Sequence, residues 1–237
     1  MSHRHFCDVA GHYWQCEGTA CVPATSPDGS WILYLSRETP EINSTTPVHI
    51  MRVPASGGPP ELVLEGRGID RQSCARSPAN LCVFSEPTSD DKQLIFSAFN
   101  PMHGRGRELT RVSLRQPNPG YDWELSRDGS RLAITQFDDR EGQIEVLPLT
   151  GGVAREVDLK GWNRLWALAW AADGNGLFID SRDHPLHYLD LEGRSHAVWQ
   201  QELPGCHLTR GIPSPDGHYL ALRGWTGESN VWMLEGF

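Results

Sequence analysis

Residues 26–35 read SPDGSWILYL, a turn tetrapeptide followed at once by an unbroken apolar run. Proline presets φ for a turn, aspartate accepts hydrogen bonds from backbone N–H groups ahead of it, and glycine tolerates a positive φ. Consecutive apolar positions are typical of a strand buried on both faces, because a sheet with one wet face would alternate. The stretch therefore predicts a turn that leads into a strand covered on both sides.

The phrase recurs along the chain, which makes an internal repeat the first question to settle. Its relatives are TSDDKQLIFS (88–97), SRDGSRLAIT (126–135), AADGNGLFID (171–180) and SPDGHYLALR (214–223). Aligned on their aspartates, the copies lie 62, 38, 45 and 43 residues apart, and the fourth to sixth residues after each aspartate are apolar. The turn residues predicted in this way are Asp28, Gly29, Asp90, Asp128, Gly129, Asp173, Gly174, Asp216 and Gly217.

Each copy is followed by a further strand, at 48–54, 107–114, 143–149, 186–191 and 230–237. Outer strands at 61–66, 155–161 and 196–202 complete three units, whereas the second unit shows no clear outer strand. The segment WNRLWALAWAAD (162–173) fits helical spacing and also alternates. The repeat register favours an inner strand, since Trp166, Leu168 and Trp170 fall where Tyr121, Trp123 and Leu125 fall one unit earlier.

Antiparallel four-stranded units of 40–50 residues are the signature of an all-β propeller. We predict units at about 21–66, 67–117, 118–160, 161–204 and 205–237. The segment 1–20 is a candidate closing strand, through HYWQC (12–16). The alternative is that five units form part of a six- or seven-bladed ring with an open edge, which is an aggregation hazard.

The Ser-Pro-Asp-Gly turn, the apolar strand, the aromatic-rich strand and the Gly-Gly turn together resemble the TolB-type, WD40-like propeller repeat of bacteria. The stretches GRGREL (104–109) and SNVWMLEGF (229–237) resemble propeller segments of bacterial signalling proteins, in which a Ser/Thr kinase or a winged-helix domain precedes the propeller. The resemblance implies a sensory or interaction module. It would be periplasmic if a membrane-anchored domain lies upstream, and cytoplasmic if expressed as given.

Composition narrows the class of partner. The 237 residues carry 21 basic and 30 acidic side chains, a net charge of −9, which argues against nucleic acid because its binders show a basic face. No apolar stretch is long enough to span a bilayer, and the first residues lack the apolar core of a signal peptide. We expect a monomer without a membrane segment.

Four of the six cysteines lie in two similar settings, CEGTACV (16–22) and CARSPANLCV (74–83). Short hairpins would bring Cys16 to Cys21 and Cys74 to Cys82 within disulfide distance, and such bonds imply an oxidising compartment. The alternative is buried, reduced thiols. A zinc site built from Cys7, Cys16 and Cys21 with His12 is a third, weaker interpretation, because the spacing is irregular.

Nucleophile-elbow, zinc-protease and phosphate-loop motifs are all absent, so the sequence predicts no catalytic residue and no cofactor. The acidic loop FDDREG (137–142) offers three carboxylates, but calcium needs six to eight oxygens, so we expect a solvated loop and no metal. The leading hypothesis is a non-enzymatic binding propeller for a protein, peptide or small molecule. The alternative is a hydrolytic or metal-assisted propeller, or the propeller component of a peptidase.

In a four-stranded meander the first and third turns lie at one end of every blade, and the second turn and the inter-blade link lie at the other. We expect the irregular loops 37–47, 100–107, 138–142, 181–185 and 224–229, with the link 160–165, to share this second end, where binding residues often lie. The candidate partner-binding residues are His103, Arg105, Arg107, Asp139, Arg140, Trp162, Arg164, Arg182, Asp183, His184 and Trp225. The alternative is solvated loops, with Trp162 and Trp225 packed between blades.

Overall fold

The computed structural model describes residues 20–38, 43–115, 120–137, 141–163, 165–181, 184, 186–199 and 206–226. Over these residues the chain forms eighteen β-strands and no helix. Every pair of neighbouring strands is antiparallel, and each sheet follows the order of the sequence. Among these residues there is consequently no helical segment that could cross a membrane.

The strands form four complete sheets and a two-stranded fifth, called blades 1 to 5. Blade 1 holds β1 (Ala20–Thr25), β2 (Trp31–Ser36), β3 (Pro47–Pro54) and β4 (Glu61–Arg67); blade 2 holds β5 (Arg71–Cys74), β6 (Cys82–Pro87), β7 (Gln93–Asn100) and β8 (Gly104–Ser113). Blade 3 holds β9 (Gly120–Leu125), β10 (Arg131–Phe137), β11 (Glu141–Pro148) and β12 (Arg155–Asn163); blade 4 holds β13 (Leu165–Trp170), β14 (Gly176–Ser181), β15 (Leu186–Asp190) and β16 (Ser195–Trp199). Blade 5 holds β17 (Cys206–Pro213) and β18 (Leu220–Thr226).

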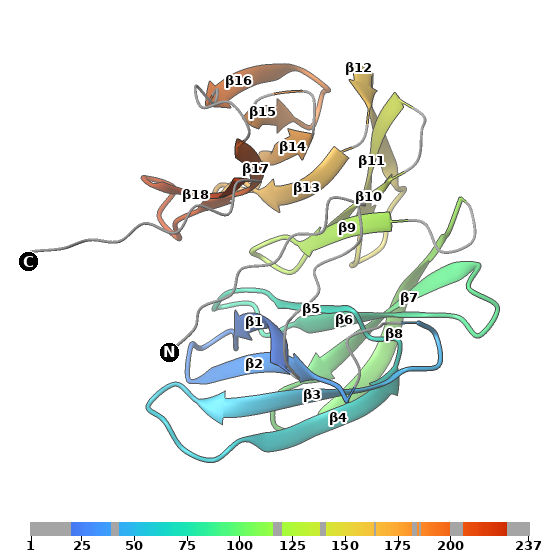
Figure 1. Cartoon of the computed structure of the whole chain (residues 1–237), viewed down its shortest axis with the longest axis vertical. Helices are drawn as coiled ribbons and strands as arrows, with labels where there is room; N and C mark the ends of the chain where they lie inside the picture. Colours follow the sequence, from blue (N-terminus) through green and yellow to red (C-terminus); the bar gives the residue numbers. More distant parts are fainter. Residues whose placement is uncertain are drawn as a thin grey trace, which may run out of the picture.

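The blades are arranged around a common centre, with the first strand of each blade innermost and the fourth at the rim (Figure 1). This arrangement confirms the predicted all-β propeller. The described residues supply four whole blades and half of another, which fits part of a larger ring.

Hydrophobic packing between successive blades explains why the strands are apolar at consecutive positions. On β10, Leu132 and Ile134 belong to the core shared with blade 2, whereas Ala133 between them belongs to the core shared with blade 4. All three side chains are at most 2% exposed. The prediction of strands covered on both faces is therefore confirmed for the interior blades. On blade 1, which no described blade precedes, Ile32 is 38% exposed.

A bond from a Ser or Thr hydroxyl to the aspartate two residues later recurs in the turns at Asp28, Asp90, Asp128 and Asp216, whereas Ala171 takes the place of the hydroxyl residue in the Asp173 turn. In the first copy the Asp28 carboxylate accepts from the hydroxyls of Ser26 (2.5 Å) and Ser30 (2.7 Å), and Ser26 Oγ accepts from Trp31 N at 3.0 Å. The bonds from Ser26 and Ser30 lower the pKa of Asp28 to about 2. Gly29 has φ +74°, which explains glycine at this position. In blade 1 this turn precedes the second strand, β2.

Blade 2 departs from the predicted register. The turn around Asp90 has the same bonds, with Thr88 Oγ1 donating to Asp90 at 2.7 Å, but it joins β6 to β7 and so is the second turn of its blade. The first turn is the segment 75–81, which contains SPAN (77–80) and lacks the aspartate and glycine. Ala79 lies 51 residues after Asp28 and 49 before Asp128, which removes the irregular spacing.

Two predictions are therefore corrected. The strand expected at 107–114 as the third of its unit is β8, the outermost, so blade 2 does have an outer strand. The error arose because the Ser/Thr–Asp turn suits any tight connection between antiparallel strands, at either end of a blade.

The ambiguous segment 162–173 is resolved as predicted, because β13 is the inner strand of blade 4. Its first residue, Trp162, belongs instead to β12 of the preceding blade. The predicted strand 230–237 and the closing strand through 12–16 lie outside the described residues.

Candidate functional site

Polar side chains on the innermost strands form a network that we call the hub network. At its centre, the carboxylate of Asp122 on β9 pairs with Arg71 of β5 and lies 3.7 Å from Arg210 of β17. The same carboxylate accepts a hydrogen bond from the backbone N–H of Leu168 on β13, at 2.9 Å. One side chain that is 7% exposed thus connects blades 2, 3, 4 and 5.

Arg210 of blade 5 bonds to residues of two other blades. Its guanidinium donates to the Glu124 carboxylate and to the carbonyl of Leu168, both at 2.9 Å. Trp170 Nε1 donates to the Glu124 carbonyl at 3.0 Å, which adds a second bond between blades 3 and 4. Burial and the neighbouring charge of Arg210 lower the pKa of Arg71 to about 9. The two arginines are thus held close together by the carboxylates between them.

A second group of the hub network lies between blades 1, 2 and 3. Ser85 Oγ donates to Asp70 at 2.7 Å and accepts from Trp123 Nε1 at 2.8 Å. Burial raises the pKa of Asp70, against bonds from Tyr121 and Ser85. Arg37, 4% exposed, lies close enough to Asp70 for their charges to interact. Ser85, Asp70 and Trp123 thus bond to one another, which is the pattern of a structural network. The buried Nε of Arg37 has no hydrogen-bond partner among the residues that the structure describes.

Loop-based reasoning missed the hub network, although the sequence carries a signal for it. In YDWEL (121–125), Asp122 and Glu124 alternate with Trp123 and Leu125, which are buried in the core toward blade 2. Two carboxylates on one face of an innermost strand indicate a charged lining that needs cations from other blades. Arg71 and Arg210 are the first-strand arginines that meet this need.

A second site lies further out, between blades 3 and 4. The pairing of β11 with β12 changes register so that residues 160–162 bulge out of the ladder, and Gly161 takes φ +79°. The bulge turns Trp162 inward, where it is 7% exposed and joins the core between the two blades. Its ring stacks on His184 at 4.2 Å between centroids and meets the edge of His187 at 4.7 Å.

Beside this tryptophan is an open cavity of about 330 Å³, which we call the Trp162 cavity. It is lined by Asp158, Leu159, Lys160, Trp162, Glu192, Gly193 and Ser195. The carboxylate of Glu192 pairs with Arg155 at 3.7 Å and with Arg194 at 3.4 Å. Within the described part of the chain, no ion pair or hydrogen bond engages the ammonium group of Lys160 or the hydroxyl of Ser195. The cavity thus offers one aromatic wall and two polar groups with capacity to spare.

The structure brings together two of the predicted site residues, Trp162 and His184. Arg105 lies elsewhere, on β8, where it pairs with Glu86 at 2.5 Å and lies over the Phe84 ring at 4.6 Å. Arg107 is exposed on the same strand. Two residues predicted in one loop therefore have different surroundings.

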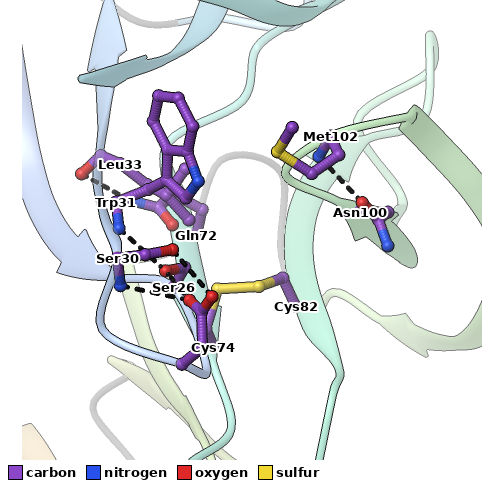
Figure 2. Close-up of a disulfide and its surroundings, with 10 residues drawn as sticks. Ser26, Ser30, Trp31, Leu33, Gln72, Cys74, Cys82, Asn100 and Met102 are labelled. Carbon is purple, nitrogen blue, oxygen red and sulfur yellow. Dashed lines mark hydrogen bonds between the residues drawn. A yellow bond between two sulfur atoms is a disulfide. The ribbon is translucent and has the colours of Figure 1, made fainter. Parts of the chain in front are cut away.

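His103 lies at the opposite end of the ring from the position expected for it. The β7–β8 connection that carries it is the third turn of blade 2, so it shares an end with the Asp-Gly turns. Figure 2 shows Met102 of this connection across the disulfide from Ser26 and Ser30 of the Asp28 turn. The expectation that every irregular loop shares one end is wrong for residues 100–107, because the register of blade 2 was misassigned.

The side chains of the other candidate residues are not described by the structure. Trp225 lies on β18, whose side chains at this point are not described. The remaining candidates, Asp139, Arg140, Arg164, Arg182 and Asp183, lie outside the described residues. Their participation stays a prediction.

Cys74 and Cys82 form a disulfide that closes the first hairpin of blade 2 (Figure 2). The segment between them contacts both neighbours, since Arg76 N donates to the Arg127 carbonyl and Ser77 N to the Pro27 carbonyl. The disulfide thus closes the first hairpin of blade 2, at the position where the other blades have an aspartate turn. Cys16 lies outside the described residues, as does most of the zinc set considered above, and the residues that are described contain no cluster suited to a metal ion.

Comparison with known proteins agrees with this geometry. No protein-family profile and no curated protein matches the sequence. Among solved structures, a TolB of Agrobacterium tumefaciens superposes with a TM-score of 0.66 at 18% identity, covering 91% of this chain and 73% of that one. The fold is a TolB-like β-propeller. A chain of the nidogen/laminin complex gives a TM-score of 0.61 at 14% identity, covering 87% of this chain and 72% of that one.

TolB of Acinetobacter baumannii matches with a TM-score of 0.59 at 15% identity over 87% of this chain, and only 51% of that chain is covered. At these identities the comparisons establish the fold alone. They confirm the TolB-like, WD40-like resemblance noted in the repeats. The link to kinases or winged-helix regulators stays a prediction.

Proposed function

We propose that this chain is a non-enzymatic recognition propeller that binds a protein partner through the rim between blades 3 and 4. The observation that carries the proposal is the division of polar groups between centre and rim. Hub side chains such as Asp122 already form ion pairs and hydrogen bonds with partners within the ring. At the Trp162 cavity, Lys160 and Ser195 keep their bonding capacity beside an aromatic wall, an arrangement suited to contact with another molecule.

The wider context of the proposal rests on other features. A propeller that superposes on this chain is found in a complex of nidogen with laminin, which supports a protein as the class of partner. The Cys74–Cys82 disulfide supports an oxidising, extracytoplasmic compartment. The resemblance of GRGREL and SNVWMLEGF to signalling propellers supports a sensory role within a larger protein.

Site-specific photo-crosslinking in the cells of origin tests the proposal. A photoreactive amino acid replaces Lys160 at the Trp162 cavity, and a control replaces Leu62, which is 56% exposed on the rim of blade 1. We expect one protein to be crosslinked repeatedly from position 160 and not from position 62. The purified pair should then form a complex of defined stoichiometry. Absence of any crosslinked protein above the Leu62 control at position 160 would contradict the proposed function.

A further inference from the structure

The outermost strand of blade 4 differs from the other three rim strands in its charge. β4 carries three charged residues, β8 four and β12 four, counted over Glu, Asp, Lys and Arg. β16 reads SHAVW and carries none. Proteins usually protect an exposed strand edge with charges or proline, because an unpaired edge invites another strand. β16 has neither protection.

The edge of β16 is also open within the described part of the chain. It pairs on one side with β15, and it is the last strand of its sheet. Its residues Ser195–Val198 are exposed, with Val198 at 42%. The backbone groups on the outer side of this strand are available to a further strand, and such strand addition is a recurring way to bind an extended peptide.

The open edge is continuous with the Trp162 cavity. Ser195 is both the first residue of β16 and a wall of the cavity, and Glu192 and Gly193 belong to the turn that precedes it. A strand paired with β16 would therefore pass the mouth of the cavity. At about 330 Å³, the cavity lies at the small end of the range for ligand pockets and has room for a side chain.

The charges around the cavity indicate which side chain it favours. Glu192 is already engaged by Arg155 and Arg194, and Asp158 accepts from Gln143 at 3.1 Å. Lys160 is the cation of the lining, and no ion pair or hydrogen bond engages its ammonium group among the residues described. A carboxylate on the incoming segment would complement it.

We infer that β16 binds an extended segment of a partner protein, which adds a fifth strand to blade 4 and places an acidic side chain in the Trp162 cavity beside Lys160. The inference rests on the proposed function and specifies its partner class. The strand supplies backbone hydrogen bonds, and the cavity supplies side-chain selectivity.

The test begins with a displayed library of random short peptides, selected on the purified chain. Enriched peptides are synthesised with a fluorophore, and their affinity is measured by fluorescence anisotropy. We expect them to share an acidic residue flanked by β-branched or aromatic residues. Methylation of alternate backbone nitrogens on one edge of a peptide should abolish binding, because it removes the donors that pair with β16.

Matched variants place the binding on this edge. Val198→Lys adds the missing charge to β16 and should weaken binding by about tenfold or more. Leu62→Lys makes the same kind of change on the rim of blade 1 and should leave the affinity unchanged. Lys160→Glu should weaken binding of acidic peptides and strengthen binding of peptides whose acid is replaced by lysine. Unchanged thermal midpoints would show that all three variants remain folded.

Several results would overturn the inference. They are the failure of any peptide to be enriched, equal binding by Val198→Lys and wild type, and binding that survives backbone methylation. A dimer that Val198→Lys dissociates would assign the edge to a second copy of this chain instead. If photo-crosslinking still identifies a partner while the peptide test fails, the proposed function stands and only the β16 docking site falls.

Discussion

The centre and the rim of the ring use the same charged side chains to different ends. At the centre, Asp122 is 7% exposed and touches groups from three other blades. At the rim, the partner of Glu108 among the described residues is Arg111, three residues along the same strand, and both are nearly half exposed. A charge at the hub thus joins blades, whereas a charge at the rim protects an edge, and its absence from β16 leaves that edge open.

Removing the central carboxylate, Asp122, should produce the largest difference in stability between a hub variant and a rim variant. Asp122→Ala leaves Arg71 largely buried without its ion-pair partner and leaves Arg210 with Glu124 alone, and we expect a loss of about 3 kcal/mol in the free energy of unfolding. Urea denaturation measures the change. The matched control is Glu108→Ala, which removes an exposed carboxylate and should leave the midpoint nearly unchanged. Equal midpoints for the two variants would contradict the structural role of the hub.

Removing the disulfide should have the next largest effect. Cys74→Ala combined with Cys82→Ala frees the hairpin that contacts blades 1 and 3, and the short loop that the bond closes predicts a loss of about 2 kcal/mol. Reduction of the wild-type protein should lower its urea midpoint to the same value. If reduction changes nothing, the bond does not replace the missing aspartate turn.

A buried carboxylate on blade 4 predicts a smaller effect that depends on pH. Asp180 is 2% exposed on β14, and burial raises its pKa from 3.8 to about 8. The folded state therefore holds a proton that the unfolded chain releases, so this contribution is complete below pH 4 and is lost as pH rises through 8. Asp180→Asn should raise the free energy of unfolding at pH 8 by at least about 1 kcal/mol. Parallel urea midpoints from pH 5 to 8 for variant and wild type would contradict this assignment.

The smallest effect on stability is expected at the rim. Val198→Lys changes a side chain that is 42% exposed on an edge strand, so the free energy of unfolding should change by less than about 0.5 kcal/mol. Its effect belongs to binding and not to folding. A large loss of stability on urea denaturation would mean that Val198 is covered in the folded chain.

The repeat around Asp128 shows how much of the fold the sequence predicts. A Ser–Asp–Gly turn and the apolar run of β10 have local causes, so they can be recognised without knowledge of neighbouring blades. The turn around Asp90 has the same local chemistry at the other end of its blade. Only the pairing of β5 with β6 reveals this difference, and a disulfide marks that pairing instead of the repeat motif.

The candidate site was also predictable only in part, because it too depends on contacts between residues that are distant in the sequence. Trp162 and His184 were both candidates, but their stacking depends on the bulge at Gly161, which no spacing in the sequence predicts. The contact of Arg210 with Glu124 joins residues 86 positions apart and depends on how the blades close around the centre. The open edge of β16 became recognisable once the three other rim strands were known.

Hydrogen exchange of the whole chain, with and without a selected peptide or the crosslinked partner, tests the division between hub and rim most directly. The account predicts slowed exchange over β16 and the turn before it, with no change over the inner strands β5, β9 and β17. Protection over those inner strands, with β16 unaffected, would place recognition at the centre of the ring and contradict the account.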